Sequence, residues 1–468
     1  MYSFLICFVA LIVSYFIYGK IIERVAGVDA NNPTPVQKLE DGVDYMPMST
    51  IKAFLVHFLN IAGLGPIFGV IQGALFGPAA FLWITLGTIF IGCIHDFFSG
   101  FMSLRNNGST MPNIISKYLG NTTQKFVAIV TVITGVLVAA VFSTGSAALI
   151  GNLTNTSITI WTLIIFIYFL IATLFPVDKI IGKIYPIFGI LFIIMIIMMT
   201  AALLLTPGYT IPEFTTPGLY LTDKPLFPYI FITIACGAIS GFHASQSPIV
   251  ARCIKSEKDA RPVFFGAMVL EGLVALCWAA IALAFFYGQP QLAAIYAATP
   301  TVAVHEMATK LVGPIGVAIV IIGIVICPIT TGDTALRSSR ITIADELHIN
   351  QEKIISRLKI AIPLFIAGYA LTFVDFTLAW RYVAWAQLII GAAVLLSATA
   401  YLIKKEKPYI ITLAPAIVCI LIIFGYIFQA PEGLRLPSMI ANILSVIATS
   451  IVTGIFLKKY RSKNTSKQ

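Results

Sequence analysis

The sequence carries little charge for its length. Only 11% of its 468 residues are Asp, Glu, Lys or Arg, whereas 59% are hydrophobic, and the mean hydropathy is +0.94. This number of charged side chains is too small to cover the surface of a water-soluble domain. The composition therefore excludes a soluble protein and predicts an all-α polytopic membrane protein surrounded by lipid. We assign the net charge of +10 to loops at a membrane surface and expect no nucleic-acid partner.

Several motifs with a known chemistry are also missing. The sequence has no GxxxxGK[ST] motif, which argues against ATP hydrolysis. It has no HExxH motif, and Thr331-Gly332-Asp333 lacks the first glycine and the Tyr-Asp partner of intramembrane aspartyl proteases, so we expect no enzyme. The seven cysteines form no CxxC pair, which predicts free thiols, and we expect no cofactor.

Apolar runs of spanning length predict about 13 transmembrane helices. The runs fall at about 2–18, 53–76, 78–104, 125–151, 157–176, 183–206, 226–251, 262–288, 312–336, 357–374, 380–402, 409–428 and 437–457. The first run has no basic region before it, so we interpret it as a span rather than a cleaved signal peptide.

The connections between these runs alternate between basic and nearly uncharged. Of the 30 Lys and Arg residues, only Lys224, Lys310, Arg381 and Arg435 fall on the nearly uncharged side. Because basic loops stay in the cytoplasm, this alternation predicts an N-terminus outside the cell and a cytoplasmic C-terminus.

The second predicted span is interrupted at its centre, over residues 60–66. This stretch holds two glycines and a proline, and a proline breaks or kinks a helix because it lacks the N–H group. Irregular backbone is tolerated in a membrane only where protein or water satisfies it, so we predict a binding site here. Its candidate substrate-binding residues are Asn60, Ala62, Gly63 and Gly65. The alternative is a kinked helix whose small residues pack against a neighbour.

The seventh predicted span has a second interruption, over residues 237–248. Polar side chains at mid-span are unfavourable unless they face a cavity or one another. The candidate substrate-binding residues here are Gly237, Ser240, Gly241, His243, Ser245 and Gln246. The alternative for this cluster is hydrogen bonding between helices.

The two interrupted spans lie five spans apart, and this odd offset makes them run in opposite directions. Interrupted spans at matching positions of two opposed halves predict an inverted repeat. We therefore divide the chain into residues 1–52 (an extra helix and a cytoplasmic linker), 53–206 (first repeat), 207–225 (outer loop), 226–402 (second repeat) and 403–468 (two further helices and a basic tail).

Four motifs carry a resemblance to known proteins. They are Asn60–Pro66, His95-Asp96-Phe97, Cys236–His243 and Thr330–Asp333. The five-plus-five arrangement resembles the leucine-transporter fold, and the chain resembles the carbon starvation protein A family of bacterial inner-membrane transporters. The resemblance implies a gradient-driven symporter that imports small peptides by alternating access, with pyruvate or a related small carboxylate as the alternative substrate. A channel or an intramembrane enzyme ranks lower, and the oligomeric state is left open.

Two groups of residues are candidates for coupling transport to an ion gradient. His95 and Asp96 lie within the third span, where a carboxylate usually marks an ion or proton pathway. Thr330, Thr331, Asp333 and Thr334 lie on the ninth span. The fold resemblance implies that hydroxyls of that helix help to form a sodium site facing the first interrupted helix. The coupling ion is thus sodium or a proton; a purely structural pairing, such as Asp333 with Arg337 one turn away, is the alternative.

The remaining candidates concern gates and metals. By analogy with the fold, residues 289–311, including His305 and Glu306, form an outer gate, and residues 338–356 an inner linker. The pattern over Ser339–Arg357 predicts an amphipathic helix. A metal site made by His57, His95 and His243 is a further alternative, although their spacing matches no metal-binding motif.

Overall fold

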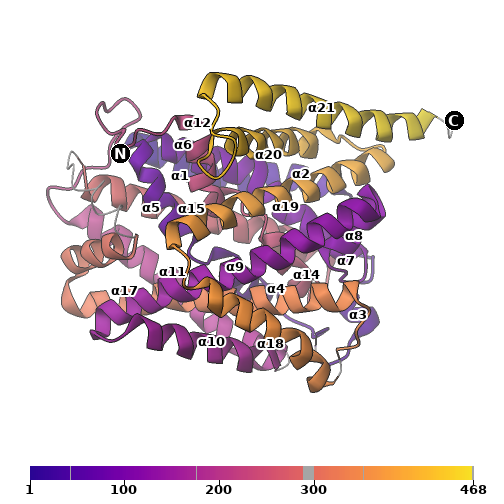
Figure 1. Cartoon of the computed structure of the whole chain (residues 1–468), viewed down its shortest axis with the longest axis horizontal. Helices are drawn as coiled ribbons and strands as arrows, with labels where there is room; N and C mark the ends of the chain where they lie inside the picture. Colours follow the sequence, from indigo (N-terminus) through magenta and orange to yellow (C-terminus); the bar gives the residue numbers. More distant parts are fainter. Residues whose placement is uncertain (43, 175–176, 288–299, 352, 466–468) are drawn as a thin grey trace.

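The protein is a bundle of helices that lie side by side, as the computed structural model shows (Figure 1). The structure describes residues 1–42, 44–174, 177–287, 300–351 and 353–465. Within these ranges the chain forms helices and loops, and its β pairing is one isolated bridge between Met48 and Ile254. The predicted all-α class is confirmed.

The described helices have the following bounds. They are α1 (Tyr2–Phe16), α2 (Tyr18–Ala26), α3 (Pro35–Leu39), α4 (Thr50–Ala62), η1 (Gly65–Gly69), α5 (Val70–Gly73), η2 (Ala74–Phe76), α6 (Ala79–Gly87), η3 (Thr88–Gly92), α7 (Cys93–Arg105), α8 (Met111–Leu119), α9 (Asn121–Thr154), α10 (Ile158–Leu174), α11 (Val177–Leu205), α12 (Leu226–Thr233), α13 (Ala235–Ala238), α14 (His243–Ala251), η4 (Glu257–Asp259), η5 (Arg261–Phe265), α15 (Gly266–Phe285), α17 (Pro300–Glu346), α18 (Ile354–Leu371), α19 (Phe376–Lys404), α20 (Ile410–Gln429) and α21 (Ser438–Thr465).

The predicted spans correspond to these helices one for one. Among the described residues, 10 helices are long and apolar enough to cross a membrane, and two bent pairs of helices each make a further span. The shorter apolar helix Ile158–Thr173 supplies the remaining span. The chain is therefore a multi-pass membrane protein.

The two bent spans lie beside each other and run in opposite directions. At one end, the Met48 backbone N–H donates to the Cys253 carbonyl at 2.9 Å, so the start of the first bent span meets the end of the second. At the other end, the Leu221 N–H donates to the Leu75 carbonyl at 2.8 Å. These two bonds place the bent spans antiparallel, as the inverted repeat requires.

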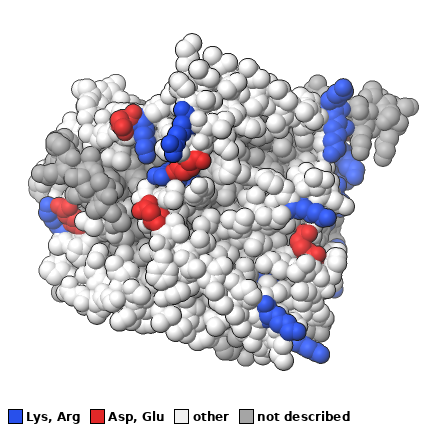
Figure 2. All heavy atoms as spheres, in the orientation of Figure 1, with Lys and Arg blue, Asp and Glu red and all other residues white. Residues whose placement is uncertain are grey.

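Charged side chains are sparse in the middle of the surface shown in Figure 2. On this face Lys and Arg predominate near one end, both signs of charge occur near the other, and a white band lies between them. The two termini lie toward opposite ends of the molecule in Figure 1. This distribution is typical of a protein whose middle faces lipid.

The long helix α17 corrects one prediction. The predicted amphipathic helix over Ser339–Arg357 has the wrong bounds, because α17 continues to Glu346 and α18 begins only at Ile354. The reason is burial: Ser339 and Arg340 are 1% and 4% exposed, so this stretch packs inside the bundle rather than lying on its surface.

Candidate functional site

The first interruption is centred on Gly63. Helix α4 continues through Asn60 and ends at Ala62, and Gly63 then adopts φ 46° and ψ −147°. Only glycine adopts such a backbone conformation without strain. The chain resumes as η1 at Gly65, and the two halves of the span are bent by 52°. The interruption is thus shorter than predicted.

The second interruption is centred on residues 239–242. Helix α13 ends at Ala238 and α14 begins at His243. The 62° bend of this span lies earlier, between Leu226–Thr233 and Ala235–Ala251. The predicted interruption extended to Pro248, but Ser245, Gln246 and Pro248 lie inside α14. Only Ser240 and Gly241 of the predicted polar cluster stand in non-helical backbone.

The two interruptions touch each other directly. A Cβ atom on Gly65 would clash with the Cys236 carbonyl, and one on Gly237 would lie 3.1 Å from the Pro66 Cα. Glycine at both positions therefore lets the two backbones approach to contact. The halves of the repeat meet here without room for a substrate in the conformation seen.

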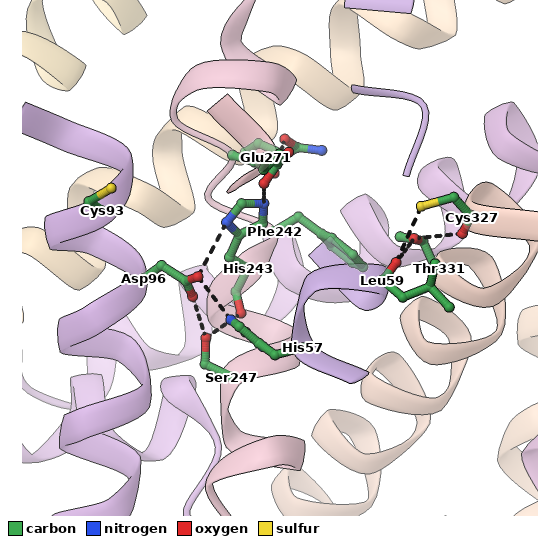
Figure 3. Close-up of polar contacts among 12 residues, drawn as sticks. His57, Leu59, Cys93, Asp96, Phe242, His243, Ser247, Glu271, Cys327 and Thr331 are labelled. Carbon is green, nitrogen blue, oxygen red and sulfur yellow. Dashed lines mark hydrogen bonds and ion pairs between the residues drawn. The ribbon is translucent and has the colours of Figure 1, made fainter. Parts of the chain in front are cut away.

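A network of buried polar side chains lies beside these interruptions (Figure 3). His57 of α4 donates from Nε2 to Asp96 Oδ2 of α7 at 2.9 Å. Ser247 of α14 donates to Asp96 Oδ1 at 2.8 Å, and Ser99 donates to Ser247 Oγ at 2.7 Å. The Asp96 carboxylate thus has a partner on each interrupted span.

His243 links this network to a second carboxyl group. Figure 3 shows its ring between Asp96 and Glu271 of α15, with Nδ1 3.9 Å from Asp96 Oδ2 and Nε2 3.2 Å from Glu271 Oε2. The second distance is short, but the groups are not aligned for a hydrogen bond, and neither Glu271 oxygen has a hydrogen-bond partner among the described residues. His57, Asp96, His243 and Glu271 are all 0% exposed.

Two members of this network were missed at the sequence level. Glu271 is a carboxyl group inside the apolar run 262–288, and that placement alone marks a candidate for function. The sequence suggests His57 only as a candidate metal ligand, whereas in the structure it is the hydrogen-bond partner of Asp96. That pairing joins residues 39 apart in sequence and has no local signal.

Some polar atoms of the predicted substrate-binding side chains form hydrogen bonds and others do not. Ser240 donates to Gln387 Oε1 of α19 at 2.9 Å, and Gln246 Nε2 donates to Ser245 Oγ at 2.8 Å. Both amide atoms of Asn60 and the Oε1 of Gln246 are buried without a hydrogen-bond partner among the described residues. Buried polar atoms are normally hydrogen-bonded, so these amide atoms are unusual, and their role in substrate binding stays a prediction.

Thr331 and Cys327 of the ninth span both face the first interrupted span, where the Cys327 thiol lies 3.5 Å from the Leu59 carbonyl. The Thr331 hydroxyl lies 3.0 Å from the Cys327 carbonyl and 3.3 Å from the Leu59 carbonyl of α4 (Figure 3). Thr330 and Thr334 instead donate to carbonyls of their own helix. The hydroxyl and the Leu59 carbonyl provide the kind of oxygen ligands that suit sodium.

Asp333 faces a different part of the bundle. Its Oδ2 accepts a hydrogen bond from the Tyr185 hydroxyl of α11 at 2.9 Å, and the residue is fully buried. On an α-helix, residues two apart point in nearly opposite directions, so Thr331 and Asp333 cannot face the same site. The structure therefore does not bring all the predicted coupling residues of α17 together.

His95 lies near the network without joining it. Its ring centroid is 6.4 Å from that of His243, and neither ring nitrogen has a hydrogen-bond partner among the described residues. Within the part of the chain that the structure describes, no group of three or more His, Cys, Asp or Glu side chains is arranged to hold a metal ion.

At the end of the bundle that holds the predicted outer gate, a cavity of about 280 Å³ is lined in part by Gly145, which packs against Leu64 beside the first interruption. Its walls include Asn152 of α9 and Thr301 of α17, and Phe376 of α19 lies at its edge. Phe376 contacts Phe68 and stacks on Trp380, with ring centroids 6.3 Å and 5.8 Å apart. These rings therefore link the wall of the cavity to η1, which follows the first interruption.

The predicted outer gate is described only in part, since residues 289–299 lie outside the described residues. His305 and Glu306 belong to the first part of α17, which bends at Gly313. Glu306 accepts a hydrogen bond from Lys310 of the same helix at 2.9 Å. The role of His305 and Glu306 as a gate stays a prediction.

On the opposite side, an ion pair closes the bundle. Arg105 at the end of α7 pairs with Glu257 of η4, and its NH2 group donates to Glu257 Oε2 and to the Gly27 carbonyl, each at 2.8 Å. Glu257 also accepts from the Asp29 backbone N–H at 3.0 Å. These bonds hold the linker after α2 against the loop that follows α14.

Solved structures define the class of this fold. MhsT, crystallised in complex with L-phenylalanine, matches with a TM-score of 0.59 and 15% identity, over 86% of this chain and 99% of that one. A manganese transporter of Eremococcus coleocola matches with a TM-score of 0.54 and 12% identity, over 90% and 99%. The chain therefore has the leucine-transporter-like fold of secondary transporters, with two antiparallel interrupted spans at its centre.

The sequence then identifies the family within this class. The chain belongs to the carbon starvation protein CstA family, whose family model matches residues 1–154 and 145–320. An uncharacterised membrane protein of Haemophilus influenzae is 40% identical over 341 residues, which cover 62% of this chain and 92% of that protein. The resemblance inferred from the four motifs is confirmed.

Relatives with named activities are more distant. The peptide transporter CstA of Bacillus subtilis is 28% identical over 57% of this chain and 55% of its own length. The pyruvate/proton symporter BtsT of Escherichia coli is 28% identical over 57% of this chain and 46% of its own length. The chain thus spans about half the length of the relatives that are named as transporters. These relatives are transporters rather than enzymes.

Proposed function

We propose that the protein is a secondary active symporter of the bacterial inner membrane that imports small peptides by alternating access. Pyruvate or a related small carboxylate is the second candidate substrate, because both kinds of substrate carry a carboxylate. A gradient of sodium or of protons drives the import. The names of the relatives from Bacillus subtilis and Escherichia coli support these two substrate classes.

One observation carries this proposal. Two bent spans run antiparallel and touch at Gly65 and Cys236, so each half of the bundle offers an interrupted helix at the same place. Interrupted helices at the meeting point of two inverted halves are typical binding sites of secondary transporters. A channel would require an open path along this axis, which the contact between the interruptions closes.

The bundle is closed at both ends, as is expected of a carrier in its occluded state. The rings of Phe68, Phe376 and Trp380 link the cavity wall at the predicted outer gate to η1, and the Arg105–Glu257 pair holds the opposite side. A carrier passes through such an occluded arrangement between its outward-open and inward-open states. Opening one side at a time would expose the interruptions to each compartment in turn.

Purified protein in liposomes tests the proposal. We expect radiolabelled dialanine or pyruvate to accumulate above its outside concentration when an inward sodium or proton gradient is imposed, to saturate, and to be released by an ionophore. A panel of unlabelled peptides, amino acids and small organic acids then identifies the preferred class by competition. Flux at channel rates without a gradient, or cleavage of the peptide, would contradict the proposal.

A further inference from the structure

Each half of the repeat contributes one histidine and one carboxyl group to the same buried cluster. The first half supplies His57 from its interrupted span and Asp96 from the next span, α7. The second half supplies His243 from its interrupted span and Glu271 from the next span, α15. The two halves are joined where His243 Nδ1 lies 3.9 Å from Asp96 Oδ2.

The two carboxyl groups have different surroundings. Asp96 accepts hydrogen bonds from His57 and Ser247, so its negative charge is well stabilised. Glu271 has no hydrogen-bond donor among the described residues, and its Oε2 lies 3.2 Å from His243 Nε2 without hydrogen-bond alignment. A fully buried carboxylate without donors is strongly unfavourable, and such a group takes up a proton instead.

The groups that face Glu271 do not give it the stabilisation that the donors His57 and Ser247 give to Asp96. Among the titratable neighbours that act on it are Cys93 of α7, Cys236 of α13, Cys327 of α17 and Asp96 itself. Thiols carry no charge at neutral pH, and Asp96 repels a second negative charge. His243 is therefore the cationic partner available to a Glu271 carboxylate in this cluster.

We infer that Glu271 is the site that carries the coupling proton, and that His243 exchanges this proton with the Asp96–His57 pair. This inference rests on the proposed symport and selects the proton rather than sodium as the coupling ion. Glu271, His243 and Asp96 lie on the helices of spans three, seven and eight, next to the contact between the interruptions. Their access to water therefore changes when the bundle opens on either side.

The proton moves in two balanced steps. The Glu271 carboxyl group gives its proton to His243 Nε2, which leaves a carboxylate and an imidazolium ion. The imidazolium ion then gives its Nδ1 proton to the Asp96 carboxylate, which leaves a carboxyl group and a neutral imidazole. Both gaps are too wide or misaligned for transfer in the present conformation, so a shift of α14 against α7 and α15 must precede the transfer.

Transport assays test the coupling through a conservative substitution. In liposomes with an inward gradient of one pH unit, one coupled proton supports up to about tenfold accumulation of dialanine or pyruvate. We expect Glu271→Gln to lose this accumulation and to keep exchange of labelled for unlabelled substrate at equal pH. Glu432→Gln serves as the matched control, because Glu432 is also largely buried but is paired with Arg381 outside the cluster.

A second measurement does not depend on the substrate. A protonated carboxyl group has a carbonyl-stretch band in the infrared that a carboxylate lacks. We expect purified wild-type protein in lipid nanodiscs at neutral pH to show such a band, Glu271→Gln to lose it and Glu432→Gln to keep it. The absence of a Glu271-dependent band would overturn the inference even if transport itself were observed.

The outcomes separate this inference from the proposed function. Accumulation that follows sodium at constant pH and survives in Glu271→Gln would overturn the proton site while supporting a symporter. Loss of proton-driven accumulation in Asp333→Asn together with its retention in Glu271→Gln would likewise overturn it. If no substrate on the panel were transported, the proposed function would fail, and the infrared band would still decide the state of Glu271.

Discussion

Gly65 of the first interrupted span packs so closely against Cys236 of the second that a methyl group on Gly65 would overlap the Cys236 carbonyl. The contact joins the first span of one half of the repeat to the first span of the other half. Its position means that any side chain at residue 65 pushes the halves apart, whereas a glycine lets one backbone rest on the other.

Gly65→Ala is therefore expected to destabilise the folded protein by about 1–3 kcal/mol, as overpacked cores are. The measurement is the midpoint of thermal unfolding in detergent. Gly454→Ala on α21 is the control, because nothing lies within 4 Å of a Cβ added there. Alanine is the better helix former, so this control should keep or slightly raise the midpoint. Equal midpoints for both variants would contradict the contact.

Asn60→Ala is expected to weaken substrate binding without weakening the fold. The Asn60 amide forms no hydrogen bond with the described residues, so its removal breaks none of the bonds that the structure shows. If the amide binds substrate, the half-saturating concentration should rise about tenfold, which corresponds to about 1.4 kcal/mol. Saturation curves in liposomes and thermal unfolding in detergent provide the two readouts.

Gln246→Ala extends the same test to the second interrupted span. Its Oε1 has no hydrogen-bond partner among the residues that the structure describes, whereas its Nε2 donates to Ser245. This variant should therefore show both a higher half-saturating concentration and a modest loss of stability. Wild-type saturation curves for Asn60→Ala and Gln246→Ala together would remove this region as the substrate site.

Arg105→Ala is expected to loosen the side of the bundle closed by Glu257. Hydrogen bonds to charged groups contribute about 1.5–3 kcal/mol, so the open population should rise by about tenfold or more. Cys253 reports the opening: it is 0% exposed, and burial raises the pKa of its thiol to about 11, which keeps it unreactive at neutral pH. Opening should expose this thiol and restore its reactivity.

Site-resolved mass spectrometry after maleimide treatment at neutral pH measures this effect. Arg435→Ala is the control, because the exposed Arg435 side chain donates to the Pro431 carbonyl of its own loop. Cys253 labelling at the same rate in Arg105→Ala and wild type would show that the ion pair does not hold this side closed.

Asp333 and Tyr185 are expected to be energetically coupled. The Tyr185 hydroxyl donates to Asp333 Oδ2 at 2.9 Å in a buried position, and its other acceptor, the Thr330 carbonyl, is more distant at 3.4 Å. Tyr185→Phe, Asp333→Ala and the double variant should therefore give a coupling energy of about 0.5–3 kcal/mol in the free energy of unfolding. Alanine is used because asparagine would keep an acceptor oxygen. Tyr426→Phe on α20, combined with Asp333→Ala, should be additive; additivity in the first pair would rule out a shared bond.

Predictions from the sequence were accurate where the determining signal is local. The long apolar runs placed the spans, and glycine and proline within a few residues placed both interruptions. The bounds of the interruptions were too wide, because Asn60 at the first and Gln246 at the second remain helical. Polar side chains inside a span do not unwind the helix when its backbone can keep its own hydrogen bonds. The prediction from side-chain polarity therefore made the interrupted stretches too long.

The direction in which each side chain points was not predictable from the sequence. Thr331 and Asp333 belong to one motif, yet Thr331 faces Leu59 of α4 and Asp333 faces Tyr185 of α11. The rotation of α17 about its own axis decides which neighbouring helix each side chain faces. That rotation depends on packing along the entire helix.

The sequence by itself determined that this chain is a polytopic membrane protein with two opposed interrupted spans, because length, apolarity and helix breaking are properties of short segments. The resemblance of its four motifs pointed to the CstA family, which the family model then confirmed. Only the tertiary structure decided that His57 binds Asp96 and that His243 lies between Asp96 and Glu271. Those contacts join four separate spans, and they exist because glycine at residues 65 and 237 lets the two halves of the bundle meet at the interruptions.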